Sequence, residues 1–226
     1  MKYENVKKAV FIDRPNRFIA NIIVDGKPSV CHVKNTGRCK ELLVKNAEIY
    51  VQEVMKETRK TSYDLITVVK GNRLVNIDSQ APNTVFYEWL MEHKEEREIT
   101  SIKREFTYKS SRFDFLIETK KQKILTEVKG VTLEENDVVL FPDAPTERGI
   151  KHIKELAASM KEGFSPLMVF LIQMKDVSYF TPNRKTHKAF ADELKAAFDA
   201  GVAVLAMDCI VTYDSITAGD FVKTVL

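Results

Sequence analysis

The sequence has few cysteines, and their number is odd. Cys31, Cys39 and Cys209 are too few for a disulfide framework. Free thiols in a reducing cytoplasm are therefore expected. Cys31, His32 and Cys39 lack both paired Cys-x-x-Cys spacing and a fourth ligand, which argues against a zinc site.

Long apolar stretches are also missing. No run approaches the ~20 residues that span a bilayer, and residues 1–5 lack the apolar core of a signal peptide. We therefore expect no membrane segment and a cytoplasmic protein. A hydrophobic content of 44% and a charged content of 30% over 226 residues are typical of a globular protein with one large or two modest domains.

Charge is distributed unevenly along the chain. Residues 1–83 carry 15 Lys and Arg against 9 Asp and Glu, whereas the remainder carries 20 against 23. A basic first part joined to an acidic second part suits a nucleic-acid-binding domain beside a cation-binding one. Because such an imbalance is also common in domains of this size, it is weak support.

The first part reads as short strands rich in β-branched and aromatic residues, with a strong turn signal at Asp25–Pro28. A short helix is expected over 40–43. The expected strands are 9–12, 18–24, 29–33, 48–51, 65–69 and 73–77. Several short strands with one brief helix fit a small closed barrel of the oligonucleotide-binding type over residues 1–83.

After Ala81–Asn83 the hydrophobic period becomes helical. The expected helices begin near residue 84 and cover 147–162 and 185–200. The expected strands are 106–108, 113–118, 124–129, 167–172 and 202–207. This order predicts a second domain over residues 84–226, a mixed sheet flanked by helices, and hence an α+β protein of two domains.

Two of these strands carry charged residues within apolar runs. Glu127 and Lys129 are two apart, so they project from one face of their strand. Asp114, on the neighbouring strand, can converge with Glu127 on a divalent cation, since hard cations prefer oxygen ligands. Two acids and a lysine are the minimal set for metal-assisted phosphodiester hydrolysis.

A plainer interpretation of these residues stays open. Glu-x-Lys is common on solvated strands, and charges within core strands can form ion pairs. Lys129 would then pair with Glu127, and Arg112 with Asp114, in a protein that binds another polyanion such as RNA. Glu88, on the helix after residue 83, is a candidate third acid or an ordinary surface residue.

Longer motifs carry a family resemblance. The segments EVKGVTL (127–133) and FPDAPTERGIKH (141–152), with HVKNTGR (32–38) and ELL (41–43), resemble the sugar fermentation stimulation protein A family. The resemblance covers essentially the whole chain. It implies an oligonucleotide-binding barrel followed by a domain similar to the PD-(D/E)xK nucleases, and DNA binding with little sequence preference. The chain departs from the family pattern at Cys39, Trp89 and Phe113, where methionine, a small residue and the proline of the nuclease signature are usual.

Carried over residue by residue, the nuclease signature falls on Glu88, Asp114, Glu127 and Lys129. Asp114, Glu127 and the main-chain carbonyl of Val128 would hold Mg²⁺ or Mn²⁺. Lys129 would position the attacking water, and Glu88 would bind that water or a second ion.

DNA contacts are expected on both domains. In the barrel they are Arg17, Lys34, Asn35, Arg38 and Lys40, although the 35–38 loop, which includes Thr36, can instead simply cap the short helix. In the second domain they are Arg112, Arg148 and His152. Arg112 can alternatively pair with Glu105, and His152 can be a surface histidine tied to Glu155 or Asp143.

The implied function has an alternative. The same fold can serve as a non-catalytic DNA-binding regulator of sugar (maltose-type) catabolism genes with a vestigial nuclease site. The oligomeric state stays open, a homodimer included, because no zipper or apolar interface stripe is evident.

Overall fold

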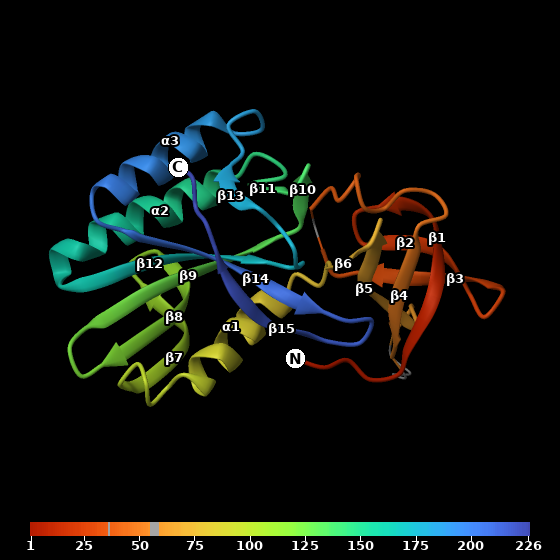
Figure 1. Ribbon diagram of the computed structural model, residues 1–226, viewed down its shortest axis with the longest axis horizontal. Helices are drawn as coiled ribbons and strands as arrows, with labels where there is room; N and C mark the ends of the chain where they lie inside the picture. The colour runs from red at the N-terminus through yellow and green to blue at the C-terminus, as the bar shows by residue number, and fades with distance from the viewer. Residues whose placement is uncertain (36, 55–58) are drawn as a thin grey trace.

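A computed structural model describes residues 1–35, 37–54 and 59–226. Two units lie side by side in Figure 1, a barrel and a larger sheet with helices. The described residues of the first unit form β1 (Val6–Asn16), β2 (Ile19–Val24), β3 (Lys27–Val33), β4 (Glu48–Glu53), β5 (Tyr63–Lys70) and β6 (Arg73–Asn76). The strand order is β3-β2-β1-β4-β5-β6, and a parallel pairing of β3 with β5 closes the barrel.

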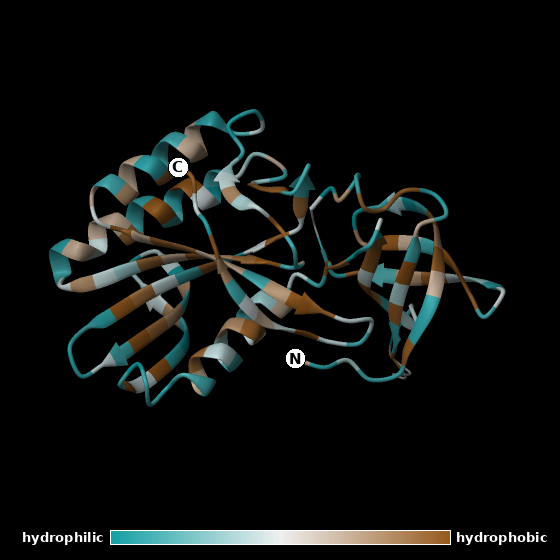
Figure 2. Ribbon diagram, in the orientation of Figure 1, coloured by the Kyte–Doolittle hydropathy of each residue, from teal (hydrophilic) through white to brown (hydrophobic). Residues whose placement is uncertain are grey.

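Alternation of residue types builds the barrel. Along β2, Ala20, Ile22 and Val24 point inward and are buried, while the residues between them are more exposed. Hydrophobic and hydrophilic residues alternate in the same way along the barrel strands in Figure 2. The predicted closed barrel is therefore confirmed.

The predicted helix over 40–43 is wrong. These residues form turns, in which the amides of Leu42 and Leu43 donate to the Cys39 carbonyl at 3.2 and 2.9 Å. The segment stops after one turn because the chain must reverse into β4, with Asn46 in a left-handed conformation at φ 68°. Cys39 and Leu42 are buried and anchor the turn to the barrel core.

The second unit begins with helix α1 (Ala81–Glu92) and contains α2 (Glu147–Ser159), a 3₁₀ turn (Met160–Glu162) and α3 (Lys188–Asp199). Its large sheet has the order β15-β14-β12-β9-β8-β7, and its strands β14, β12 and β9 are parallel. The bounds are β7 (Ile99–Tyr108), β8 (Ser111–Thr119), β9 (Lys123–Val131), β12 (Phe164–Ile172), β14 (Ala203–Val211) and β15 (Ile216–Val222). A small sheet joins β10 (Leu133–Glu135), β11 (Val138–Phe141) and β13 (Tyr179–Pro182). The sequence did not predict four of these strands, β10, β11, β13 and β15.

The helices cover both faces of the large sheet: α2 and α3 lie together on one face and α1 lies on the other (Figure 1). Strand β9 alternates between these layers. Leu125 and Val131 join the core under α2 and α3, whereas Val128 joins the core under α1. Glu127 and Lys129 therefore face the α2 side, as their two-residue spacing predicts.

Polar contacts join the two units. Lys70 pairs with Glu134 at 2.5 Å and Arg73 with Asp137 at 2.8 Å. The start of the chain lies on the second unit, where Lys2 and Ser215 form an isolated antiparallel β-bridge. Within the described residues, no helix is long and apolar enough to cross a membrane.

Candidate functional site

Asp114 lies where strands β8 and β9 part. Their ladder ends at the pair Phe115 and Thr126. One residue beyond this pair, the Asp114 side chain takes the place of a backbone hydrogen bond between the strands. Its Oδ2 accepts a hydrogen bond from the Val128 amide at 2.7 Å. Its Oδ1 accepts from Asn83 Nδ2 of helix α1, also at 2.7 Å. The carboxylate is thus fixed by a strand and a helix.

Glu127 is the second acid of the site and is 3% exposed. Its Oε1 accepts from the ammonium of Lys129 and contacts His152 Nδ1 at 2.6 Å. Its Oε2 is buried without a hydrogen-bond partner among the described residues. An unpartnered buried carboxylate oxygen is costly unless a cation or another ligand satisfies it.

His152 takes a role that the sequence analysis did not foresee. The prediction offered a phosphate contact or a surface histidine tied to Glu155 or Asp143, but His152 is 3% exposed and contacts Glu127. Arg148 Nε donates to His152 Nε2 at 3.4 Å. Since Nε2 accepts, Nδ1 carries the proton and donates to Glu127. The reason for the difference is that α2 lies directly over β9.

The pKa values of the two carboxyls are shifted in opposite directions from their ordinary values. Burial, together with the nearby Glu127 charge, raises the pKa of Asp114 against its hydrogen bonds and Lys129. Burial also opposes ionisation of Glu127, but the His152 hydrogen bond and the Lys129 charge outweigh it and lower the pKa of Glu127.

The residues present fit a hard divalent cation. Such ions accept one or two carboxylates and keep several waters, and Glu127 Oε2 is a ligand atom that has no hydrogen-bond partner among the described residues. In the described part of the chain, no group of three or more His, Cys, Asp or Glu side chains could hold a metal. The Val128 carbonyl as a third ligand stays a prediction.

Glu88 does not join this cluster. Its carboxylate forms an ion pair with the amino group of Met1 at 2.5 Å and is about half exposed. Helix geometry explains this, because Asn83 is the α1 residue that contacts Asp114, and residues five apart lie on different helix faces. Asn83 was missed, although its spacing from Phe86 and Leu90 places it on the buried face.

The alternative based on structural ion pairs is half correct. Lys129 does pair with Glu127. Arg112, however, pairs with Glu105 at 3.3 Å on the exposed surface and not with Asp114. Among the described residues, Asp114 therefore forms no ion pair with the basic residue of its own strand.

In the barrel loop, Asn35 and Arg14 have structural roles. Asn35 Nδ2 donates to the Ile77 carbonyl at 3.0 Å, and its Oδ1 accepts from the Gly37 amide at 2.7 Å. These hydrogen bonds shape the loop, as the alternative interpretation of the 35–38 loop expects, and a phosphate contact by Asn35 stays a prediction. Arg14, which the sequence analysis missed, donates to four carbonyls of the neighbouring loops. Thr36 lies outside the described residues.

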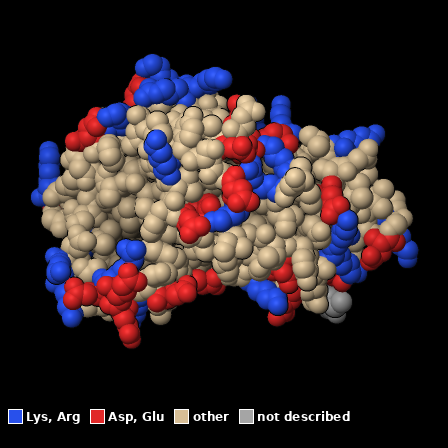
Figure 3. Space-filling model, in the orientation of Figure 1, with Lys and Arg blue, Asp and Glu red and all other residues tan. Residues whose placement is uncertain are grey.

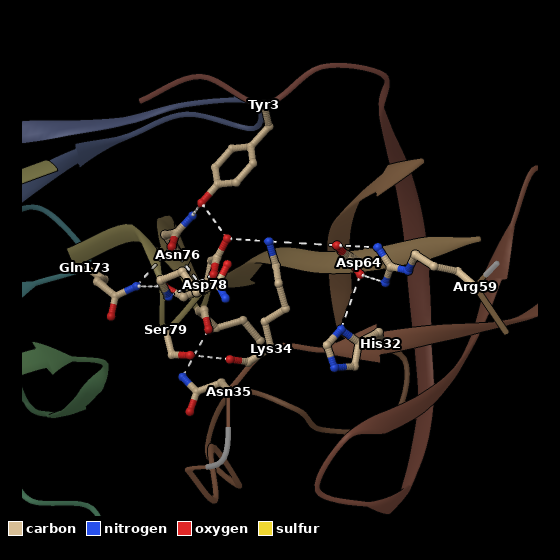
Figure 4. A network of polar contacts seen from close by, with 12 residues as sticks. Tyr3, His32, Lys34, Asn35, Arg59, Asp64, Asn76, Asp78, Ser79 and Gln173 are labelled. Atoms are coloured by element: carbon tan, nitrogen blue, oxygen red, sulfur yellow. Dashed lines mark hydrogen bonds and ion pairs between the residues drawn. The ribbon is translucent and has the colours of Figure 1, made fainter. Parts of the chain in front are cut away.

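Lys34 belongs to a largely buried polar network (Figure 4). Its ammonium lies 2.6 Å from the carboxylate of Asp78, which has no exposed surface, and 3.8 Å from Asp64. Because these two buried acids engage the ammonium, a contact of Lys34 with DNA stays a prediction that has to compete with these ion pairs. The network continues from Asn76 to Gln173 at the end of β12.

Three of the predicted barrel cations remain accessible. Arg17, Arg38 and Lys40 are exposed, and no ion pair involves their side chains among the described residues. The Arg38 amide donates to Asp143 Oδ2 at 2.9 Å, which holds this loop against the second unit. A groove of about 290 Å³ runs from the loop at Asn35 and Gly37 to Gly130, the residue after Lys129.

Comparison with known proteins shows the family to which the chain belongs. A family model described as "Sugar fermentation stimulation protein RE domain" matches residues 80–215, and one described as "SfsA N-terminal OB domain" matches residues 12–77. The chain belongs to the sugar fermentation stimulation protein family. The resemblance in the motifs and the predicted order of barrel and mixed sheet are thereby confirmed.

Relatives match the chain over its full length. The homologue from Desulfitobacterium hafniense is 58% identical, covering 100% of this chain and 99% of the relative. That from Clostridium beijerinckii is 54% identical and covers 100% of both chains. A solved structure of Pyrococcus furiosus SfsA in complex with Ca²⁺ has a TM-score of 0.87 and 28% identity, covering 100% of this chain and 98% of that chain.

Proposed function

We propose that this member of the family binds DNA with little sequence preference and hydrolyses its phosphodiester bonds, with Mg²⁺ or Mn²⁺ held by Asp114 and Glu127. The observation that carries the proposal is the pair of carboxylates, Asp114 partly buried and Glu127 buried, with an unpartnered Glu127 Oε2. Lys129 lies beside it. Such a cation supplies Lewis-acid polarisation of a phosphoryl oxygen and makes water a better nucleophile at neutral pH.

The chain's own residues prepare this chemistry. The Val128 amide and Asn83 orient Asp114, and His152 holds Glu127 in place. Lys129 is partly accessible, with 20% of its side chain exposed. Its ammonium can therefore exchange one hydrogen bond to Glu127 for one to a water molecule or to a phosphate oxygen.

Two further observations support the proposal. The Pyrococcus furiosus relative was solved with Ca²⁺, so a protein of this fold takes up a hard divalent cation. In this chain the groove beside Gly130 leads to the barrel loop of Arg38. In the view of Figure 3, Lys and Arg are mixed with Asp and Glu across the middle of the molecule, so DNA contact is argued from these loops and not from one large basic field.

The test is incubation of the purified protein with single-stranded, duplex and branched DNA in Mg²⁺, Mn²⁺ or EDTA. Wild type should cleave only with a cation, and Asp114→Asn and Lys129→Met should each lower the rate by about 10²-fold or more. Glu118→Gln, on the same strand β8 but paired with Lys103 and Lys123, is the matched control and should cleave normally. Calorimetric titration with Mg²⁺ should show binding to wild type and to Glu118→Gln but not to Asp114→Asn.

A second function is favoured by one observation: Glu127 Oε1 is already satisfied by Lys129 and His152, so part of the site is stable without a cation. This suits a DNA-binding regulator with a silent nuclease site. DNA binding without cleavage in any cation would establish that function and refute hydrolysis. Unchanged cleavage by Asp114→Asn would refute the assigned site.

A further inference from the structure

An aromatic side chain stands in solvent at one end of the barrel. Arg17 and Phe18 form the turn between β1 and β2, and Phe18 is 51% exposed. The backbone there is well fixed: Asn16 Oδ1 accepts from the amides of Phe18 and Ile19 at 2.9 and 3.1 Å. The Phe18 carbonyl accepts from the Val33 amide at 2.8 Å. The ring is thus presented by a rigid turn.

Arg14 links this turn to the segment that carries Arg38 and Lys40. Its guanidinium donates to the carbonyls of Arg17 at 2.6 Å, Gly37 at 2.9 Å and Arg38 at 3.0 Å. The backbones of Arg17 and Arg38 therefore lie around one guanidinium, and Lys40 follows two residues later. In Figure 1 the β1–β2 turn and the segment after β3 lie together at one end of the barrel.

This combination has a specific chemical use. A half-exposed phenylalanine cannot hydrogen-bond, but its ring can stack on a nucleobase, and flanking cations can contact phosphates. In duplex DNA the bases are already stacked on one another, so the ring gains a partner only where a base is unpaired. Two exposed apolar residues lie on the outer face of β2 and β3, Ile23 at 36% and Val30 at 44% exposure. That face and the β1–β2 loop are where barrels of this type bind oligonucleotides.

We infer that this end of the barrel is a binding site for single-stranded DNA, in which Phe18 stacks on an unpaired base and Arg17 and Arg38 contact the adjoining phosphates. The inference rests on the proposed DNA binding and specifies its substrate. Asp143 holds the Arg38 loop against the second unit. A bound strand can therefore continue along the groove toward Gly130 and Lys129.

The chain offers a matched control for the aromatic ring. Phe198 on helix α3 is 47% exposed, close to the value for Phe18, and has a cation nearby, Lys195 at 6.0 Å from the ring centre. Lys195, however, is paired with Asp199 at 2.5 Å. The same substitution can therefore be made at two phenylalanines of similar exposure, only one of which lies at the proposed site.

The experiment measures fluorescence anisotropy of a labelled (dT)₁₂ strand and of a labelled 12-base-pair duplex, with Phe18→Leu, Phe18→Trp and Phe198→Leu beside wild type. Phe18→Leu should weaken binding of the single strand by about 5- to 150-fold, since stacking contributes about 1–3 kcal/mol per base. Phe18→Trp and Phe198→Leu should bind it as wild type does or more tightly. Duplex binding should change by less than about twofold in Phe18→Leu.

Salt titration separates stacking from charge. Phe18→Leu should leave the slope of log K against log salt unchanged, whereas Arg17→Gln should reduce it by about 0.7 on the single strand. Equal binding of (dT)₁₂ by Phe18→Leu and wild type would overturn the inference but leave the proposed function standing. If wild type binds neither DNA, both fail. Tighter binding of (U)₁₂ than of (dT)₁₂ would also overturn the inference, because it would make RNA the ligand.

Discussion

Replacing Lys34 with alanine is expected to destabilise the protein and to leave the salt dependence of DNA binding unchanged. The Lys34 ammonium lies 2.6 Å from the carboxylate of Asp78, a side chain with no exposed surface. It also lies 3.8 Å from Asp64, which is 5% exposed. The substitution therefore leaves a buried negative charge without its cation.

The magnitude follows from what remains around each acid. Removing one partner of a buried ion pair costs about 3–5 kcal/mol. Asp78 keeps hydrogen bonds from the Tyr3 hydroxyl at 3.3 Å and the Gln80 amide at 3.0 Å, and Asp64 keeps its pair with Arg59. The lower end, about 3 kcal/mol, is therefore expected. For a chain of this length that lowers Tm by about 6–12 °C.

The assay is thermal unfolding of Lys34→Ala beside Lys40→Ala, followed by DNA titration well below the transition. Lys40 is exposed, so its substitution should change stability by less than about 0.5 kcal/mol. Adding Asp78→Asn to Lys34→Ala should recover part of the loss, because the unpaired charge is then removed. The reasoning would be refuted if Lys34→Ala melted with wild type and lowered the salt slope.

Two further predictions concern residues of strands β9 and β10. Burial raises the pKa of Glu134, but hydrogen bonds from Lys70 and the Asp137 amide outweigh it and lower the pKa below its ordinary value. This carboxylate therefore stabilises the fold above its ordinary pKa near 4.3 and loses that contribution as pH falls further. Between about pH 5 and pH 3, the Tm of Glu134→Gln should fall less than the Tm of wild type. Parallel plots of Tm against pH for the two proteins would contradict this prediction. In Gly130→Ala the new Cβ would lie 2.5 Å from Gln173 Oε1 and 2.6 Å from Pro82 Cγ, so we expect a loss of about 1–3 kcal/mol in urea unfolding, and an unchanged midpoint would exclude such tight packing.

Local features of the site could be predicted because they depend on short-range geometry. The two-residue period of a strand places Glu127 and Lys129 on one face, and the β8–β9 hairpin brings Asp114 beside them. The period of α2 likewise follows from its apolar spacing. Such patterns need only the conformation of a few consecutive residues.

Partners that are distant in sequence could not be predicted. Asn83 contacts Asp114 from 31 residues away, and His152 contacts Glu127 from 25 residues away. Nothing in the composition of these segments distinguishes a buried histidine over an acid from a surface one, since the difference arises only when α2 packs on β9.

The same limit applies to the cations of the barrel. Lys34 and Arg38 lie in one short basic motif and look equivalent as a sequence, yet Lys34 neutralises buried acids while Arg38 is exposed. The sequence by itself determined the family, the two-unit architecture and the candidate acids, because periodicity and residue type express them directly. Only the tertiary structure decided which charges are satisfied internally and which are free for a ligand, because burial and pairing depend on which segments the fold brings together.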